Sequence, residues 1–450
     1  MHQSAIRTLL RTTNDRTANS SACAPMLPNV AMPCLMPYDP SMIESGSAPT
    51  LSLPDLTASS SLPGGVRDVA IDVSDAYLTD ARFDLPGAEG LAIQRLLTLA
   101  QSLPSIKFVW AHAAARRVLS SPALHPLAAV ALCLSNAAHV CQGEQVFRKE
   151  DFVRARQTLL AHKLAADMFS ERQILICLDN QRPSLPFDLY EPSTRRLRRD
   201  DEFESLVDNL LFAQGGPGFS AEVLPKVRLP LAVILRELIE NTDDHAKTNF
   251  DGSVLQPNAV RGLLVKRIME ERRFPTKQAG DKPPVPCLEF TIFDSGIGYY
   301  NSYRRQLLQG QARGAPVKVG DKQADIIQSH ELGPDVPLDT EYAILLKCLG
   351  RHSDNAIPDP RPGHRGMGLY EVLRALNMMQ GMFEVRTGRI HGYRSFLEGE
   401  LRIQLEPRSS EMRPGMPKAS LLDVANKYVT KPTEHELVRG SVVRVVVPLA

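Results

Sequence analysis

The sequence predicts an α/β protein in which two α/β regions follow a polar tail. Three observations lead to this fold class. Strand-like and helix-like apolar patterns alternate over residues 66–180, they alternate again over residues 205–450, and residues 1–65 are instead rich in Ser, Thr, Ala and Pro. The chain of 450 residues has room for two or three domains, and residues 181–204 form the predicted linker.

The overall composition excludes several classes of protein. A net charge of +1 gives no reason to expect nucleic acid or an anionic membrane as a partner. No apolar run approaches the ~20 residues that cross a bilayer, and the most apolar stretch, residues 126–140, predicts a buried helix. The seven cysteines form no CxxC pair, so neither a disulfide framework nor a zinc site is indicated, and a reducing, cytoplasmic setting is expected.

The tail, residues 1–65, is predicted to be largely disordered because its composition does not offset the entropy of ordering a chain. Its first 38 residues contain three arginines and a single acid, Asp15, which loosely resembles an organelle transit peptide. The alternatives are a flexible tail and a start codon placed too early.

The first α/β region begins with a predicted strand at 66–74. An amphipathic helix at 87–103 and a buried strand at 106–111 follow. Helical pattern then continues to about residue 168, and "RQILICLDN" (172–180) predicts another strand. The region contains no catalytic constellation, so we expect a partner-binding or sensing module.

Isolated polar residues in and after this region are interpreted as structural. Four scattered histidines favour structural roles over ligation: His112, His125, His139 and His162. Four arginines in the linker either dock an acidic partner or form a solvated face, and the acids at 200–202 partly cancel their field: Arg195, Arg196, Arg198 and Arg199.

The second region opens with "LPLAVILRELIENTDDHA" (229–246), which predicts a helix with Pro230 in its first turn. Glu237, Asn241 and Asp244 follow a 0, +4, +7 spacing and therefore share a stripe beside the apolar one. An Asn side-chain oxygen can bind Mg²⁺. A Glu one turn earlier can deprotonate a water or hydroxyl aimed at a γ-phosphate. Taken alone, the pattern also fits a solvated acidic face.

A second motif, "CLEFTIFDSGIGYY" (287–300), predicts a strand that runs directly into Asp294. Gly296 and Gly298 allow a tight turn in which the backbone approaches a ligand closely. The carboxylate can accept a hydrogen bond from an exocyclic amine such as that of adenine. The alternative is an ordinary Asp-Gly turn.

A third motif, "GHRGMGLYEVLRAL" (363–376), places glycines before a predicted helix. A glycine-rich turn at a helix N-terminus presents free N–H groups and the positive end of the helix dipole, which together suit a phosphate. Arg365 lies inside this turn and can pair with a terminal phosphate. The alternative is a simple loop.

These three motifs resemble the N, G1 and G2 boxes of the GHKL ATPase superfamily, which includes gyrase-type and mismatch-repair ATPases, chaperones, histidine kinases and anti-sigma-factor kinases. Two later segments agree with the resemblance, "GMFEVRTG" (381–388) and the last predicted strand, "GSVVRVVVPL" (440–449). The resemblance covers residues 205–450. It implies a two-layer α/β sandwich of the Bergerat type that holds ATP between a sheet and a flexible lid.

The resemblance also implies roles for individual residues. Glu237 matches the catalytic glutamate, Asn241 the Mg²⁺-binding asparagine and Asp294 the adenine-binding aspartate. The remaining nucleotide-binding positions are the glycines of the two turns and the arginine between them: Gly296, Gly298, Gly363, Arg365, Gly366 and Gly368.

The sequence departs from the family in two long insertions, residues 299–362 and 389–438, which are expected to form a lid, a dimer contact or a partner surface. "SHELGPDVPL" (329–338) resembles a histidine-kinase phosphoacceptor box around His330, but it follows the second motif instead of preceding the first. Gly333 and Pro334 would also break an acceptor helix, so this interpretation is rejected.

We therefore expect a soluble, Mg²⁺-dependent ATP-binding protein of the GHKL type, an ATPase that acts as a switch on its N-terminal module, a protein partner or a homodimer. One alternative is a serine protein kinase of the anti-sigma type, and another is an adaptor that binds ATP without hydrolysing it. A DNA-processing ATPase is disfavoured because the sequence lacks a basic stripe.

Overall fold

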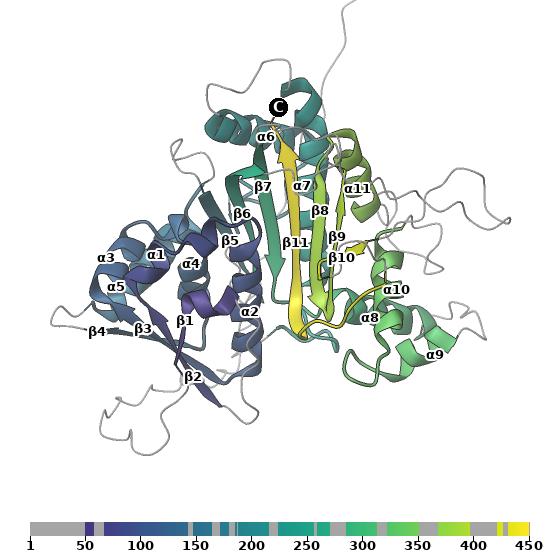
Figure 1. Cartoon of the computed structure of the whole chain (residues 1–450), viewed down its shortest axis with the longest axis horizontal. Coiled ribbons are helices and arrows are strands. Elements are labelled where there is room, and N and C mark those ends of the chain that lie inside the picture. The colour runs from purple at the N-terminus through teal and green to yellow at the C-terminus, as the bar shows by residue number, and fades with distance from the viewer. Residues whose placement is uncertain are drawn as a thin grey trace, which may run out of the picture. The chain divides into compact units, whose positions relative to one another are not determined.

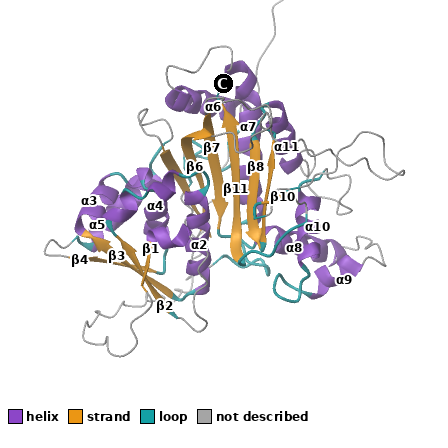
Figure 2. Ribbon diagram, in the orientation of Figure 1, coloured by secondary structure: helices purple, strands orange, loops and turns teal. Residues whose placement is uncertain are grey.

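Two β-sheets organise the computed structural model of the chain (Figures 1 and 2). The first has four parallel strands in the order β1-β2-β3-β4, and the second has seven antiparallel strands in the order β10-β9-β8-β11-β7-β6-β5. The chain is therefore mixed α/β, as the sequence predicts. The structure describes residues 50–57, 67–142, 147–163, 172–179, 185–186, 188–215, 224–255, 259–270, 285–312, 322–350, 368–396, 421–425 and 431–449.

The parallel sheet and its helices are built from the first third of the chain. In order they are β1 (Thr50–Ser52), η2 (Leu53–Thr57), β2 (Asp68–Val73), α1 (Asp75–Leu78), η3 (Ala81–Asp84), α2 (Ala88–Ser102), β3 (Ser105–Ala111), α3 (His112–Ser120), η4 (Pro122–Leu124), α4 (Pro126–Cys133), β4 (Ala137–Gln142) and α5 (Lys149–Leu160). The predicted strands at 66–74 and 106–111 and the predicted helix at 87–103 are confirmed as β2, β3 and α2. Alternate residues of β2 and β3 are buried, which is the period of a strand with one face on a core.

The prediction of disorder is wrong for residues 50–57. β1 pairs in parallel with β2, with Leu51 beside Ile71, and the turn that follows it buries Leu53 and Leu56. These leucines give the segment enough apolar surface to order itself on the sheet, in spite of the Ser-rich and Pro-rich sequence around it. Residues 1–49 and 58–66 lie outside the described residues.

The prediction of one buried helix over residues 126–140 is also wrong. Helix α4 ends at Cys133, and strand β4 begins at Ala137. Asn136 fixes the turn between them because its side-chain amide donates to the carbonyl oxygens of Ala100 (3.1 Å) and Leu103 (3.0 Å). The chain then enters the sheet beside β3.

The antiparallel sheet contains β5 (Arg172–Asp179), β6 (Ala259–Glu270), β7 (Val285–Asp294), β8 (Met382–Gly388), β9 (Ile390–Ser395), β10 (Leu422–Asp423) and β11 (Val438–Pro448). Its helices are α6 (Asp200–Gly215), α7 (Leu224–His245), α8 (Gly298–Ala312), α9 (Lys322–Ser329), α10 (Leu338–Cys348) and α11 (Gly368–Met378). Five of these elements confirm predicted ones: β5, β7, β8, β11 and α11.

Strand β5 lies in the antiparallel sheet, beside β6, although the sequence grouped it with the N-terminal module. Both of its faces are buried. Ile174 and Ile176 pack in the core that covers the parallel sheet, and Leu175 and Cys177 pack in the core under α6 and α7. A strand that is apolar on both faces fits only where two cores meet.

Helices cover both faces of the antiparallel sheet. On one face, α6, α7 and α11 share a core with the strands, and Figure 1 shows α7 behind the strands. On the other face, α2 lies directly on β7 and β11, because a Cβ atom on Gly90 would come within 2.7 Å of Thr291 Cγ2 and 3.4 Å of Val442 Cγ1.

The contact between α2 and the antiparallel sheet is rich in charge. The Gly87 N–H, at the start of α2, donates to the Glu289 carboxylate (3.1 Å), which also accepts from Arg444 (2.7 Å). Arg172 donates to the buried Glu89 at 3.2 Å. These groups connect the N-terminal module to the face of the sheet opposite α7.

Helix α7 begins at Leu224 and not at Pro230, so the predicted start is wrong. Proline removes one backbone hydrogen bond, and its ring crowds the carbonyl of the residue four positions earlier. Val227 and Leu231 are buried in the same core on either side of Pro230, and this burial offsets the loss.

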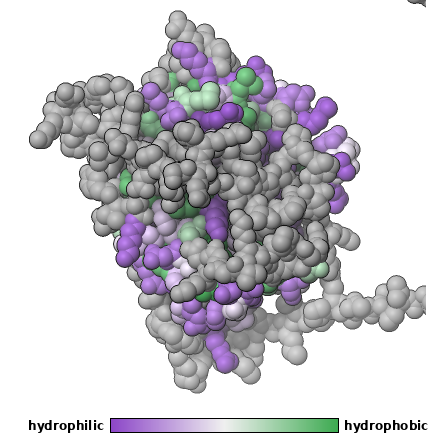
Figure 3. Space-filling view, turned by 90° about the vertical axis from the view of Figure 1, so that its right-hand side faces the viewer, coloured by the Kyte–Doolittle hydropathy of each residue, from purple (hydrophilic) through white to green (hydrophobic). Residues whose placement is uncertain are grey.

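Both predicted insertions contribute regular structure. Residues 299–362 supply most of α8 and all of α9 and α10, whereas residues 389–438 supply β9 and β10 at one edge of the sheet. The Tyr342 hydroxyl in α10 donates to the Leu421 carbonyl (2.9 Å) and so joins the two insertions. Seen from the side of α8, α9 and α10, the described surface is mostly hydrophilic (Figure 3). Of the helices in the described ranges, none combines the length and apolar character that a membrane span requires.

Candidate functional site

The first and second sequence motifs meet at one hollow. It is a small hollow, open to solvent and with a cavity volume of about 20 Å³, where the last turns of α7, the end of β7, the start of α8 and β11 come together. Two predicted residues of different motifs, Asn241 and Asp294, both line it. Its lining residues are Asn241, His245, Ala246, Asp294, Gly298, Tyr299, Ser302 and Ser441.

Asp294 is the buried acceptor of this hollow, with 4% of its surface exposed. It ends β7 and pairs in register with Ser441 of β11. Its Oδ1 accepts from the Gly296 N–H at 2.8 Å, and its Oδ2 accepts from the Ser441 hydroxyl. Burial raises the pKa of Asp294, and these two hydrogen bonds oppose that rise. The carboxylate is thus held in one orientation.

The second motif needs glycine at positions 296 and 298, because neighbouring atoms lie too close for a side chain and Gly298 has a positive φ. A Cβ atom on Gly296 would lie 2.7 Å from the Cα atom of Ala246, the residue that follows α7. Gly298 has φ +74°, and a Cβ atom there would lie 3.0 Å from Thr387 Oγ1. The turn therefore packs against the end of the first motif.

Gly440 and Ser441 belong to the site, although the sequence singled them out only as part of a strand. Gly440 has φ +69°, and a Cβ atom there would overlap the Asp294 carbonyl oxygen. The glycine lets β11 approach β7 closely enough for Ser441 to reach the Asp294 carboxylate. A Gly-Ser pair in front of a run of valines is consistent with the start of a strand, but it does not show which residue Ser441 contacts.

Helix α7 presents Asn241 and His245 to the hollow. The predicted stripe included Asp244, but His245 is the residue that lines the hollow one turn after Asn241. The spacing of four residues brings it to the same face. The Asn241 Nδ2 donates to the Tyr299 hydroxyl at 3.1 Å, which links α7 to the first turn of α8.

Glu237 lies one turn before Asn241 and meets the first residue of α11. A Cβ atom on Gly368 would lie 2.7 Å from Glu237 Oε2, so the end of the third motif lies against the first. Three predicted residues of the third motif, Gly363, Arg365 and Gly366, lie outside the described residues.

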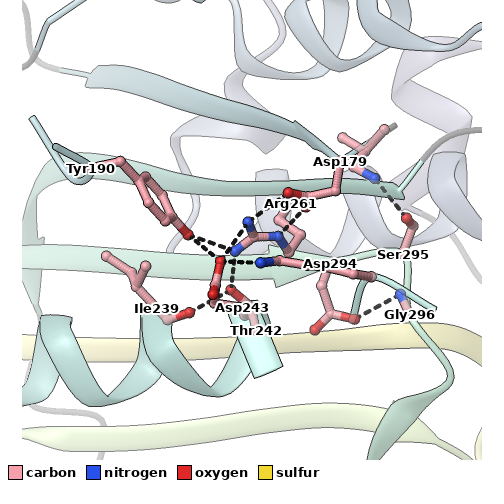
Figure 4. A network of polar contacts seen from close by, with 11 residues as sticks. Asp179, Tyr190, Ile239, Thr242, Asp243, Arg261, Asp294, Ser295 and Gly296 are labelled. Atoms are coloured by element: carbon pink, nitrogen blue, oxygen red, sulfur yellow. Dashed lines mark hydrogen bonds and ion pairs between the residues drawn. The ribbon is translucent and has the colours of Figure 1, made fainter. Parts of the chain in front are cut away.

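Arg261 of β6 holds the end of α7 in place, as Figure 4 shows, and no sequence motif includes this residue. Its side chain is 1% exposed, and its guanidinium forms a two-pronged ion pair with Asp179 of β5. It also donates to Thr242 Oγ1 (3.1 Å), Asp243 Oδ1 (3.1 Å) and the Tyr190 hydroxyl (3.0 Å). Thr242 and Asp243 directly follow Asn241, so this network fixes the turn of α7 that lines the hollow.

The charges of this network are balanced. Burial works to raise the pKa of Asp243, but Arg261 and Lys247 outweigh it and hold this pKa below its usual value. The Tyr190 hydroxyl donates to Asp243 Oδ1 at 2.8 Å and completes the set. Each buried charge therefore has an opposite charge or a hydrogen bond.

Among the residues around the hollow, Asn241 has a side chain of the kind that binds Mg²⁺ together with phosphates. Within the described ranges, no group of three or more His, Cys, Asp or Glu side chains is arranged to hold a metal ion by itself. Mg²⁺ commonly takes one or two protein ligands and completes its shell with phosphate oxygens and water. The amide oxygen of Asn241 is a ligand of this kind.

Comparisons of the chain with protein-family models, with curated proteins and with solved structures find no match.

Proposed function

We propose that the hollow binds ATP with Mg²⁺ and that the chain is an ATPase of the GHKL type. One observation carries the proposal: residues from three separate segments, Asn241 of α7, Asp294 and Gly298 of the second motif, and Ser441 of β11, line one hollow. Chance motif matches scattered over 200 residues of sequence would not be expected to meet. The antiparallel sheet with α7 and α11 on one face supports the proposed Bergerat-type fold.

In this proposal Asp294 accepts a hydrogen bond from the exocyclic amine of adenine, and Asn241 binds the metal. Bound Mg²⁺ supplies charge neutralisation at the phosphates. Glu237 orients and deprotonates the attacking water, since it lies one helical turn from Asn241 and against the N-terminus of α11. Gly363, Arg365, Gly366 and Gly368 are proposed to hold the phosphates.

The proposed switch is supported by the position of α2. This helix lies on β7 and β11, the two strands that bring Asp294 and Ser441 to the hollow, but on their opposite face. Its Gln94 side chain also donates to the Arg386 carbonyl of β8 at 2.9 Å. Ordering of the site by ATP would therefore act on strands that already contact the N-terminal module.

A second candidate keeps the same site and changes the reaction: a serine protein kinase that passes the γ-phosphate to a partner protein. The position of His245 beside Asn241 favours it, because the sequence pattern Glu-x-x-x-Asn followed by His is the feature shared with anti-sigma-factor kinases. Transfer of radiolabelled phosphate to candidate partners distinguishes this reaction from hydrolysis.

The test is to measure ATP binding and turnover with Mg²⁺ for the wild type, Glu237→Ala and Asp294→Asn. We expect Asp294→Asn to lose binding and Glu237→Ala to bind without turnover. Glu240→Ala is the matched control, because it removes another carboxylate of α7, one that pairs with Arg236 at 3.5 Å and has no proposed role at the nucleotide. Absence of ATP binding by the wild type would refute the proposal.

A further inference from the structure

The buried hydroxyl of Tyr299 contacts the one side chain that is proposed to bind the metal. Tyr299 is 7% exposed and packs in the core of the antiparallel sheet. The Asn241 Nδ2 donates to its hydroxyl oxygen at 3.1 Å. This interaction uses the nitrogen end of the amide, so the oxygen end is the part of the group that remains to meet a cation.

We propose that Tyr299 is a positioning residue that orients the Asn241 amide, with its oxygen toward Mg²⁺ and its nitrogen toward the hydroxyl. The inference rests on the proposed function, since it concerns how the same site holds its metal. Tyr299 lies in the second motif, but the family resemblance gives it no role, and the inference assigns it one.

The physical reason lies in the symmetry of the amide group. The oxygen and the NH₂ group of asparagine are similar in size, and a half-turn about the last side-chain bond exchanges them. Only the oxygen can bind a cation, and the NH₂ group then needs an acceptor of its own. A partner that meets this need fixes the ligand and makes it a better one, as outer-shell groups do at other metal sites.

Tyr299 is suited to this task because its position is fixed. It follows Gly298, whose positive φ turns the chain into α8, and its N–H lies 3.4 Å from Thr387 Oγ1 of β8. The Tyr299 hydroxyl oxygen is therefore held where it accepts from the Asn241 amide.

The neighbouring Tyr300 offers a matched control. It is equally placed in the first turn of α8 and is 3% exposed, but its hydroxyl donates to the His330 carbonyl at 3.2 Å and does not contact Asn241. Tyr299→Phe and Tyr300→Phe each remove one buried hydroxyl and keep the ring. Only the first removes the partner of the amide.

The experiment measures the dissociation constant of a fluorescent, non-hydrolysable ATP analogue, once in saturating Mg²⁺ and once in excess EDTA. The dissociation constant in EDTA divided by the dissociation constant in Mg²⁺ is a ratio that reports how strongly the metal supports binding. We expect Tyr299→Phe to lower this ratio by roughly 10-fold or more, the effect of losing an outer-shell partner, and to leave the value in EDTA unchanged. Tyr300→Phe should keep the wild-type ratio.

A second measurement repeats Tyr299→Phe in an Asn241→Asp background. Both oxygens of an aspartate can bind a cation, so its orientation no longer matters, and Tyr299→Phe should then change the ratio little. An equal effect in both backgrounds would overturn the inference.

The remaining outcomes are also decisive. If Tyr299→Phe weakens binding equally in Mg²⁺ and in EDTA, its role is structural and the inference fails. A wild-type ratio in Tyr299→Phe, or a wild type without any metal effect, overturns it as well. If the wild type binds no analogue under either condition, the proposed function itself fails.

Discussion

Glu237 and Gly368 are in such close contact that a Cβ atom on Gly368 would lie 2.7 Å from the carboxylate oxygen Oε2 of Glu237. The two residues are more than a hundred positions apart in the sequence. They meet because α7 and α11 share a core on one face of the antiparallel sheet. The absence of a side chain at the first residue of α11 leaves the space that the carboxylate occupies.

Gly368→Ala is expected to displace this carboxylate without unfolding the protein. The clash is with the far end of a flexible side chain, and alanine is a better helix former than glycine, so unfolding free energy should change by about 1 kcal/mol or less. ATP turnover should fall roughly 10- to 100-fold because the base is misplaced. Thermal denaturation and steady-state turnover check the two halves of the prediction.

Gly333→Ala is the control for this substitution, because the nearest atom to its added Cβ would be 3.8 Å away. It should retain wild-type turnover. Unchanged turnover in Gly368→Ala would argue against Glu237 as the base.

Ser441→Ala is expected to shift the pH dependence of nucleotide binding upward. The Ser441 hydroxyl donates to Asp294 Oδ2 and stabilises the ionised carboxyl group, so its removal raises the pKa of Asp294 further. Protonation of Asp294 as the pH falls removes the acceptor for adenine. The pH at which binding is half lost should rise by about 1 to 2 pH units, the scale of one charge-assisted hydrogen bond.

Dissociation constants measured from acidic to neutral pH test this shift. Ser329→Ala is the control, since the Ser329 hydroxyl donates to the Asp325 carbonyl on the exposed surface of α9. An identical pH profile for Ser441→Ala and the wild type would contradict the proposed role of Asp294.

Glu89→Gln is expected to stabilise the protein above neutral pH. Burial raises the pKa of Glu89 from 4.5 to about 7, and Arg172 offsets only part of this rise. In the unfolded chain the carboxyl group ionises near its ordinary pKa, whereas in the folded protein it stays protonated until about pH 7. The free energy of unfolding of the wild type therefore falls as the pH rises from the unfolded-state pKa to the folded-state pKa, by on the order of 3 kcal/mol.

The check is denaturant unfolding at pH 4.5 and pH 8. Glu89→Gln and the wild type should differ little at the lower pH, and the variant should be the more stable at the higher one. Glu150→Gln alters an exposed carboxylate in the first turn of α5 and should follow the wild type at both values. A constant difference between Glu89→Gln and the wild type would exclude the ionisation of Glu89 as the cause.

Arg261→Met is expected to destabilise the fold by about 3 to 5 kcal/mol, because Asp179 then stays buried without its cation. Adding Asp179→Asn should restore part of this loss. Arg228→Met removes ion pairs from an arginine that is 40% exposed and should cost about 1 kcal/mol or less. Equilibrium unfolding of these variants measures all three effects, and additive losses in the double variant would contradict a direct pair.

The parts of the fold with a strong local pattern were predictable. Strands β2, β3, β5, β7, β8 and β11 and helices α2 and α11 follow from runs of apolar residues with the period of a strand or a helix. Strand β4 was missed because its alanines and histidine continue the composition of α4, and only the contacts of Asn136 with distant carbonyls end the helix. The early start of α7 depends in the same way on burial of Val227.

The residues of the candidate site also differ in whether a local sequence pattern predicts them. Glu237, Asn241 and Asp294 stand out because each has a characteristic local spacing. Ser441 and Arg261 do not, since each acquires its place from a partner on another strand or helix: Ser441 from the register of β11 with β7, and Arg261 from Asp179 and the end of α7. No local pattern encodes such partners.

The position of α2 on the antiparallel sheet has a consequence for how the protein unfolds. Along β7 and β11, alternate residues serve two different cores: Ile292 and Val443 pack under α7, whereas Phe293 and Val442 pack with the N-terminal module. Neither core can be opened without exposing one side of these two strands. The two modules should therefore melt together in one cooperative transition, and the backbone amides of β7 and β11 should be among the slowest in the chain to exchange with deuterated solvent.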